Sequence, residues 1–249
     1  MPPKILVICG PTASGKTALA VELALRHHGE VVSADSMQIY RRMDIGTAKP
    51  TPEEMRGIPH HMLDVADPEE DFSVARYVEL AAPCVDDILA RGKLPIVAGG
   101  TGLYLDSLLS GRTFAPFSPD GGLRARLEAR FDALGGEAML GELAAADPEA
   151  AARLHPNDRK RIVRALEVFQ QTGKTISQHN RETRALPLRY DALTLSLAFQ
   201  RREDMWARID RRVDQMARDG LEAEVRGLLS SGLPRTCTAM QAIGYKEFV

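Results

Sequence analysis

The segment ICGPTASGKTALA, residues 8–20, decides the fold. Within it, residues 10–17 have the pattern G-x-x-x-x-G-K-T. An apolar run over residues 5–9 precedes this octet, and the helix-forming run ALAVELALRHH follows it. The P-loop pattern requires this strand, loop and helix context. The sequence therefore predicts a loop that binds a polyphosphate or a pyrophosphate.

Each part of the predicted loop has a chemical task. Gly10 and Gly15 allow the backbone to curl until successive N–H groups converge on one anion, and the helix that follows adds the positive end of its dipole. Lys16 supplies a cation for the outer phosphate oxygens, and the hydroxyl of Thr17 is placed to ligate Mg²⁺, the one cofactor expected. The predicted anion-binding residues are Gly10, Pro11, Thr12, Ala13, Ser14, Gly15, Lys16 and Thr17.

Size and composition are those of a soluble enzyme. The chain has 249 residues, 44% of them hydrophobic, which is enough for a large α/β domain with a smaller insertion. It lacks both a signal-peptide pattern and an apolar run of membrane-spanning length, so we expect a cytoplasmic protein with no membrane contact. Cys9, Cys84 and Cys237 are widely spaced, which favours neither disulfides nor a zinc site.

The order of apolar segments predicts a doubly wound parallel sheet of the P-loop NTPase type with an inserted all-helical lobe. Strands are expected at residues 4–9, 30–34 and 94–98, a returning strand at 193–199, and a long helix at 202–229. The Pro- and Gly-rich stretch GRTFAPFSPDGG begins at Gly111, and the sequence after it is helical to about residue 183. We expect a core domain at residues 1–113 and 190–249, and a lobe at 114–189.

Charge is distributed unevenly along the chain, although the formal net charge is only −2. Residues 51–90 contain ten Asp and Glu against two Arg, whereas residues 151–190 contain nine Arg and Lys against three acids. The basic stretch suits an anionic partner, although such a run is also typical of a solvated face.

Two further strand ends supply candidate polar groups. Asp35 follows the second predicted strand, and Thr101 stands in the glycine-rich turn after the strand at 94–98. Ligands of open parallel sheets bind beyond the carboxyl ends of the strands, so both residues are expected near the P-loop. Position alone leaves open whether Asp35 orders Mg²⁺ or acts as a general base. His60 and His61 are adjacent and so do not face one metal ion from a regular element.

At these residues the chain resembles a known family, the bacterial tRNA dimethylallyltransferases, also called isopentenyltransferases. The resemblance runs from residue 4 to the end. Seven segments carry it in order: GPTASGKT, DSMQ (35–38), GTAKP (46–50), PHHMLD (59–64), GGTGLY (99–104), NDRKRIVRALEV (157–168) and AMQAIGYKE (239–247).

The resemblance implies an activity in which the P-loop binds a leaving group. Dimethylallyl pyrophosphate would donate its dimethylallyl group to the N6 amine of adenosine 37, and Lys16 would stabilise the departing pyrophosphate. Asp35 matches the family's general base and Thr101 a donor to the leaving oxygen. Arg212 matches an arginine placed near the pyrophosphate; on its own it also fits an exposed helix arginine.

By the same resemblance the inserted lobe contacts the tRNA anticodon stem-loop, with the sequence A36-A37-A38. Where the family usually has Gln, this chain has Lys160, so a base contact there is in doubt. Gln38 suits a purine edge, or else caps the next helix. The residues implied to contact tRNA are Asp35, Ser36, Met37, Gln38, Thr101, Arg124, Lys160, Arg161, Ile162, Val163, Arg164, Gln241, Gly244, Tyr245 and Lys246.

Family members usually continue past GYKE with a basic helical segment. We therefore expect that segment to be absent from this chain, which ends at Val249, and we expect a monomer.

Three other functions remain open at this point: a small-molecule kinase with an arginine-rich lid, a non-catalytic RNA-binding module, and a prenyltransferase acting on free nucleotides. The basic helical lobe argues against the last, because a free nucleotide needs no second domain to hold it.

Overall fold

The computed structural model describes residues 2–111 and 121–249. The contacts divide the chain into two compact units. The first comprises Met1–Leu109 and Leu188–Val249, and the second comprises Ser110–Pro187. The boundary expected after residue 113 lies outside the described residues, and the second boundary, expected after residue 189, falls after residue 187.

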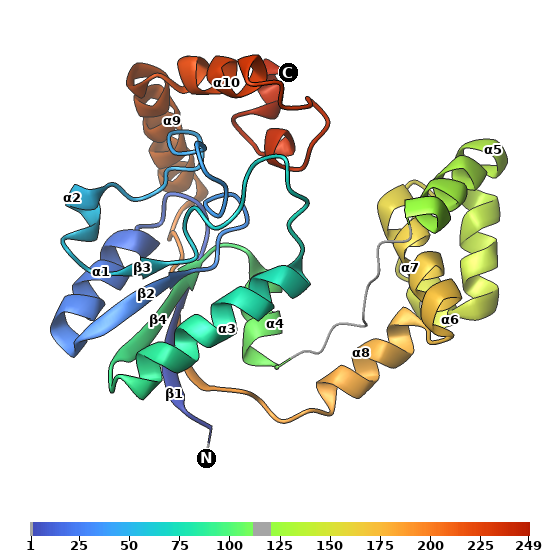
Figure 1. The fold of residues 1–249 in the computed structure, drawn as a ribbon, viewed down its shortest axis with the longest axis horizontal. Helices are drawn as coiled ribbons and strands as arrows, with labels where there is room; N and C mark the ends of the chain where they lie inside the picture. Colours follow the sequence, from blue (N-terminus) through green and yellow to red (C-terminus); the bar gives the residue numbers. More distant parts are fainter. Residues whose placement is uncertain (1, 112–120) are drawn as a thin grey trace. The chain divides into compact units, whose positions relative to one another are not determined.

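The first unit is built on a five-stranded parallel sheet with the order β3-β2-β4-β1-β5 (Figure 1). The mixed α/β architecture expected from the sequence is confirmed. The strands are β1 Lys4–Cys9, β2 Gly29–Ser33, β3 His60–His61, β4 Leu94–Gly99 and β5 Asp191–Ser196.

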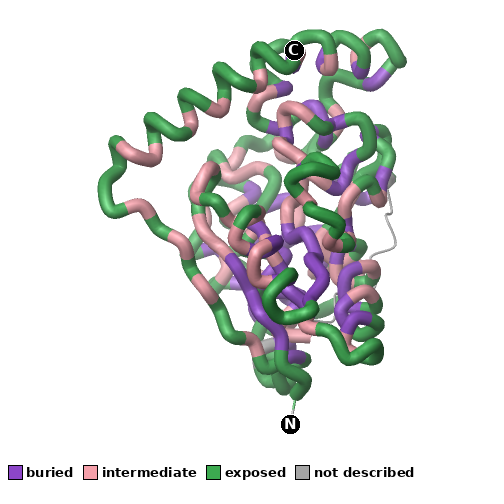
Figure 2. The backbone as a smooth tube through the Cα atoms, turned by 90° about the vertical axis from the view of Figure 1, so that its left-hand side faces the viewer, coloured by how far each residue is buried: buried purple, intermediate pink, exposed green. Residues whose placement is uncertain are grey.

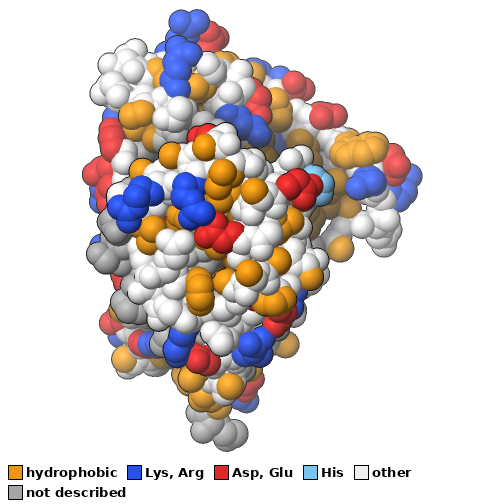
Figure 3. Space-filling view, turned by 90° about the vertical axis from the view of Figure 1, so that its right-hand side faces the viewer, with side chains coloured by type: hydrophobic (Ala, Val, Ile, Leu, Met, Phe, Trp, Pro, Cys, Tyr) orange, Lys and Arg blue, Asp and Glu red, His pale blue; other side chains and the backbone are white. Residues whose placement is uncertain are grey.

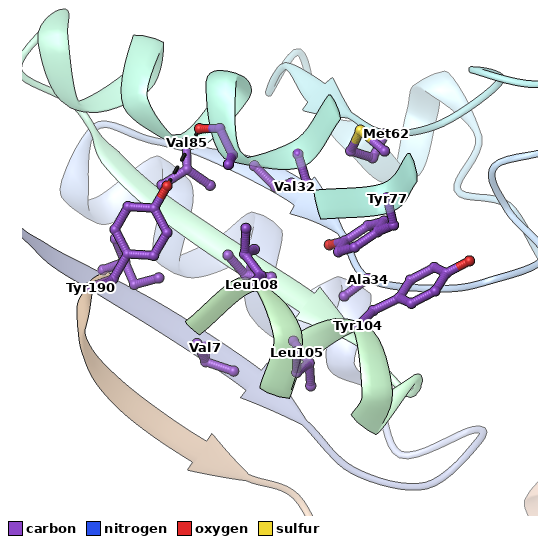
Figure 4. Close-up of a cluster of buried hydrophobic side chains, with 14 of the residues drawn as sticks. Val7, Val32, Ala34, Met62, Tyr77, Val85, Tyr104, Leu105, Leu108 and Tyr190 are labelled. Carbon is purple, nitrogen blue, oxygen red and sulfur yellow. Dashed lines mark hydrogen bonds between the residues drawn. The ribbon is translucent and has the colours of Figure 1, made fainter. Parts of the chain in front are cut away.

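Alternate residues of each strand point to opposite faces of the sheet, so the sheet has two apolar faces. Helices pack against both of them. Leu6 and Ile8 of β1 pack with Ala20 and Ala24 of α1 on one face. Ile5 and Val7 belong to the cluster on the other face, which Figure 4 shows. The helices of this unit are α1 Lys16–His27, α2 Pro52–Met55, α3 Val74–Ala90, α4 Gly102–Leu109, α9 Arg202–Asp219 and α10 Leu221–Ser230, with short 3₁₀ turns at Ala239–Gln241 and Lys246–Phe248.

Three details of the predicted elements were wrong. The strand β3 was missed because two residues carry no periodic signal. The returning strand begins at Asp191 instead of residue 193 and ends at Ser196. The helix expected over residues 202–229 is two helices, because Gly220 has φ 100° and ends α9 in the left-handed conformation.

The second unit is entirely helical within its described residues, as expected. Its helices are α5 Gly121–Ala146, α6 Pro148–Ala151, α7 Arg159–Thr172 and α8 Ile176–Arg184. Gly135 breaks the regular geometry of α5 with φ 80°. Leu127, Met139 and Leu166 are at the centre of its core. The buried carboxylate of Asp147 joins two helices, because it caps α6 at Ala150 N and accepts a bond from Ser177 N of α8.

Most residues of the central strands β2, β4 and β1 are buried (Figure 2), whereas the strand β5, all of whose residues are described, has no buried residue. β2 is buried over its whole length, whereas α9 has no buried residue in the part of the chain that the structure describes. Among the described residues, no helix has both the length and the apolar character that a membrane crossing requires.

A buried carboxylate ties together the end of the sheet where β2 begins. The Glu30 carboxylate accepts bonds from Arg91, from Lys93 Nζ at 2.7 Å and from His61 Nε2 at 2.8 Å. The hydrogen bonds from Arg91 are the largest influence that holds the pKa of Glu30 well below its ordinary value. Glu30 is only 2% exposed. It therefore depends on these donors to remain charged.

We predict that Gly99→Ala lowers the free energy of unfolding by about 1–3 kcal/mol. A Cβ at Gly99 would lie 2.2 Å from the backbone oxygen of Ala34, and backbone gives way less readily than a side chain. Gly102→Ala is the matched control from the same turn, because its Cβ would meet nothing within 4 Å. Chemical denaturation of both variants is the measurement, and equal stability would contradict the steric argument.

We predict that Glu30→Gln lowers the free energy of unfolding by about 2–3 kcal/mol at pH 7, less than for a fully buried pair because the partners stay partly exposed. The folded-state pKa of Glu30 is depressed, so its stabilisation is present above the unfolded pKa of about 4.3 and is lost as pH falls further. The difference in free energy of unfolding between the wild type and Glu30→Gln should therefore become smaller at acidic pH. Glu22→Gln, which removes a solvent-accessible partner of Arg26, should lower the free energy of unfolding far less than Glu30→Gln does at pH 7.

Candidate active site

A cavity of about 690 Å³ opens beyond the carboxyl ends of the strands in the first unit. The P-loop forms one wall, and the loop after β2, the segment 44–54 and helix α9 form the others. Its lining residues are Thr12, Ala13, Ser14, Gly15, Lys16, Thr17, Ala18, Asp35, Gln38, Asp44, Ile45, Ala48, Lys49, Thr51, Glu54, Arg212, Gln215, Met216 and Asp219.

The P-loop has the backbone conformation that its glycines were expected to permit. Gly10 has φ 147° and Gly15 has φ 90°, both in the region that disfavours other residues. Lys16 begins α1, and its Nζ donates to Gly10 O at 2.9 Å and to Pro11 O at 2.7 Å. The lysine cation is thus held against the backbone of the loop.

Two cations of this cavity are partly removed from water. Burial lowers the pKa of the Lys16 ammonium, and the nearby Asp35 carboxylate opposes this shift. Burial also lowers the pKa of the Arg212 guanidinium, again opposed by Asp35. Arg212 is therefore not an ordinary exposed helix arginine. A bound polyanion would restore to both cations the favourable environment that burial removes.

Asp35 follows the end of β2, in a turn that its own side chain stabilises. Its Oδ1 accepts bonds from Met37 N at 2.8 Å and from Gln38 N at 3.3 Å. These two bonds fix the carboxyl group while leaving acceptor capacity on Oδ2. Thr101 braces the same turn, because its Oγ1 accepts a bond from Ser36 N at 3.0 Å and its own N–H donates to Ala34 O.

Gln38 neither caps a helix nor stands free. Its amide lies between Ser33 of β2 and the carbonyl oxygens of residues 47 and 48. Lys49, which the sequence places within GTAKP, is also a cavity residue. Its side chain is 6% exposed, and its ammonium contacts both Asp44 and Asp64. The acidic residues Asp44 and Asp64 on either side of Lys49 in the sequence were the signal that could have identified Lys49 as a site residue.

The candidate tRNA residues of the second unit fall into two groups. Ile162 and Val163 are 0% and 3% exposed, so the implied tRNA contact is wrong for their side chains, which belong to the helical core. The remaining three residues of the segment, Lys160, Arg161 and Arg164, line a cavity of about 360 Å³ within this unit.

The basic character of the second unit is weaker than the sequence count indicated. Arg124 and Arg164 both bond the buried carboxylate of Glu167. Arg159 pairs with Asp132 and Arg181 with Glu149, acids that lie outside the segment counted. Figure 3 shows Lys and Arg side chains scattered among acidic and apolar ones on the face it presents.

The candidate tRNA residues near the end of the chain are also divided. Tyr245 is 0% exposed and its hydroxyl donates to Glu224, so a tRNA contact through its side chain is wrong. Gln241 and Lys246 are exposed and Gly244 is half-buried.

The groups present fit a magnesium ion bound mainly through a substrate. The structure shows no cluster of three or more His, Cys, Asp or Glu able to hold a metal among its described residues. Thr17 and Asp35 both line the cavity. Mg²⁺ commonly binds through one or two protein oxygens together with substrate phosphates, so this sparse oxygen set is suitable.

Known proteins match the chain over nearly its whole length. A family model described as IPP transferase matches residues 38–249, and one described as Isopentenyl transferase matches residues 3–70. A protein from Trichlorobacter lovleyi named tRNA dimethylallyltransferase 1 is 52% identical over 99% of this chain and 80% of its own length. A tRNA dimethylallyltransferase from Acetivibrio thermocellus is 49% identical over 98% of this chain and 78% of its own.

Solved structures agree. The tRNA delta(2)-isopentenylpyrophosphate transferase of Staphylococcus epidermidis is 42% identical, with a TM-score of 0.66 over 98% of this chain and 79% of that one. A eukaryotic dimethylallyltransferase described as acting on tRNA is 32% identical, with a TM-score of 0.83 over 99% of this chain and 62% of that one.

We predict that Lys16→Met weakens binding of inorganic pyrophosphate by at least about tenfold, because a charge-assisted hydrogen bond is lost. Arg26→Met is the control, since it removes an exposed cation from the other end of the same helix. Titration calorimetry measures both. Equal affinities for the two variants would show that pyrophosphate binds elsewhere.

Proposed function

The chain belongs to the IPP transferase family, and we propose that it transfers a dimethylallyl group from dimethylallyl pyrophosphate to the N6 amine of adenosine 37 of tRNA. One observation carries this proposal: an anion-binding loop and the Asp35 carboxylate line the same cavity. A cavity of about 690 Å³ is large enough for a small donor and one nucleobase.

The P-loop side of the cavity is suited to a departing pyrophosphate. When the bond from the allylic carbon to oxygen breaks, the electron pair leaves with the pyrophosphate. The P-loop, Lys16 and Arg212 all line the cavity in which this negative charge would develop. Groups that are already oriented stabilise such charge without reorganising at the moment of reaction. The loop therefore serves a leaving group instead of a transferred phosphoryl group.

The Asp35 side of the cavity is suited to activating the amine. The N6 lone pair forms the new bond to carbon, and the amine becomes positively charged as it does so. Asp35 accepts one N6 proton, which leaves a neutral alkylated amine. Its Oδ1 is committed to the turn, so Oδ2 is the oxygen assigned to this proton. Thr101 keeps the turn in place through Ser36.

A magnesium ion, if bound at Thr17, would supply positive charge to the pyrophosphate oxygens. The residue of this chain that would hold it is Thr17, together with oxygens of the bound pyrophosphate.

Adenosine 37 must leave the anticodon-loop stack to reach a carboxylate inside a cavity, at a cost of about a few kcal/mol. Contacts with the stem-loop have to offset this cost. We assign them to two sets of residues: Lys160, Arg161 and Arg164, which line a cavity in the second unit, and Gln241 with Lys246, which are exposed near the end of the chain. We further propose that the chain acts as a monomer in the cytoplasm on tRNAs with the sequence A36-A37-A38.

The relatives give no support to a small-molecule kinase, the alternative that the P-loop alone leaves open. They are named as transferases of dimethylallyl or isopentenyl groups, and their likeness extends through both units.

We predict that Asp35→Asn lowers the rate of dimethylallyl transfer to tRNA by about 10²–10⁴-fold, the usual range for a lost general base. Asparagine keeps an Oδ1 acceptor for Met37 N and Gln38 N, so the turn should survive. Mass spectrometry of tRNA nucleosides after single-turnover incubation with the donor measures the rate.

Asp210→Asn is the control for this variant, because Asp210 is exposed on α9. It should react at the wild-type rate. Transfer by Asp35→Asn at a rate equal to that of the control would exclude Asp35 as the base.

A further inference from the structure

A carboxylate far away in the sequence binds the loop that forms one wall of the cavity. Glu224 of α10 accepts bonds from Asp44 N and Ile45 N, both at 2.8 Å, and from Gly46 N at 3.2 Å. Three successive backbone donors that converge on one anion form a strong, oriented contact. The hydroxyl of Tyr245 donates to the same carboxylate at 2.5 Å.

Tyr245 also closes this loop from the side. A Cβ built on Gly46 would lie 2.4 Å from Cε2 of the Tyr245 ring. The backbone at Gly46 therefore rests directly against the ring, and the loop has little room to move toward it. Carboxylate and ring together fix the position of residues 44–46.

The carbonyl groups that follow this clamp determine the orientation of Gln38. Its Nε2 donates to Thr47 O at 3.3 Å and to Ala48 O at 3.1 Å. Carbonyl oxygens only accept hydrogen bonds, so the amide nitrogen has to face them and the amide oxygen has to face away. Ser33 then donates its hydroxyl to Gln38 Oε1 at 3.1 Å.

This arrangement leaves the Gln38 amide able to accept one more hydrogen bond but not to donate one. Both hydrogens of its Nε2 are engaged by the loop, and one lone pair of Oε1 is engaged by Ser33. The second lone pair of Oε1 remains. Gln38 lines the same cavity as Asp35, so toward a ligand there it acts as an acceptor only.

We propose that Glu224 is a positioning residue which, through the backbone of residues 44–48, locks the Gln38 amide as an acceptor and so makes the cavity select a base with an amine at position 6. This inference rests on the proposed function. Adenine has two N6 hydrogens: one goes to Asp35 in the reaction, and the other is available to Gln38 Oε1.

The same lock rejects a base with a carbonyl oxygen at position 6. Two acceptors would then face each other, and the amide could not turn over without giving up its bonds to Thr47 O and Ala48 O. Selectivity of this kind comes from the penalty against the wrong base as well as from the contact with the right one. A variant that loosens the loop should therefore improve binding of the base with the carbonyl oxygen relative to binding of adenine.

The test compares two anticodon stem-loop RNAs that differ only at position 37, one with adenosine and one with inosine, which carries a carbonyl oxygen at position 6. Their dissociation constants are measured by competition on the full chain. We expect the wild type to prefer the adenosine RNA and Glu224→Gln to reduce this preference by about tenfold. Glu222→Gln is the matched control, because Glu222 is exposed on the same helix and pairs with Arg226.

A purely structural role would weaken the binding of both RNAs by the same factor, and an unchanged ratio would overturn the proposal. If Glu224→Gln does not fold, Glu224→Asp keeps the charge and shortens its reach by one methylene, and the same ratio decides. Failure of the wild type to prenylate the adenosine RNA would instead overturn the proposed function, which the binding ratio does not test.

Discussion

Parallel pairing of β2, β4 and β1 brings three loops to one edge of the sheet, and the central groups of the cavity depend on that pairing. The P-loop follows β1, the Asp35 turn follows β2 and the Thr101 turn follows β4. Gly99 allows β4 to end directly against the backbone of Ala34, where a Cβ would collide. The hydrogen bond from Ser36 N to Thr101 Oγ1 then joins two of the loops. A catalytic geometry assembled this way needs the strands in their correct register.

The electrostatics of the cavity favour a guest with several negative charges. Lys16 and Arg212 have their pKa values lowered because burial takes them from water. Asp35 opposes this shift at both cations but is a single carboxylate. A pyrophosphate group carries more charge than that carboxylate, so it is the better partner for the two cations. Binding of a pyrophosphate would thus favour the charged forms of Lys16 and Arg212, and these charged forms would in turn favour its binding.

The sequence was informative wherever neighbouring residues perform the chemistry. The P-loop, Asp35 and the glycine turn at Thr101 each lie at the end of one strand, so local motifs placed them at one edge of the sheet. Glu224 escaped prediction because it bonds residues about 180 positions earlier, with no local pattern to mark it. Ile162 and Val163 were misjudged because a basic segment of a helix also contributes its apolar face to a core. Gly220 was overlooked because a single glycine within an amphipathic pattern is also compatible with a continuous helix.

The contact between Gly46 and Tyr245 has an evolutionary consequence. The two residues are far apart in the sequence, yet a Cβ at position 46 would collide with the Tyr245 ring. Substitutions at these two positions are therefore expected to occur in pairs: a side chain at 46 would require a smaller residue at 245. Such a double change would also remove the phenol hydroxyl that donates to Glu224. The hydrogen bond to Glu224 therefore limits which substitutions positions 46 and 245 can accept.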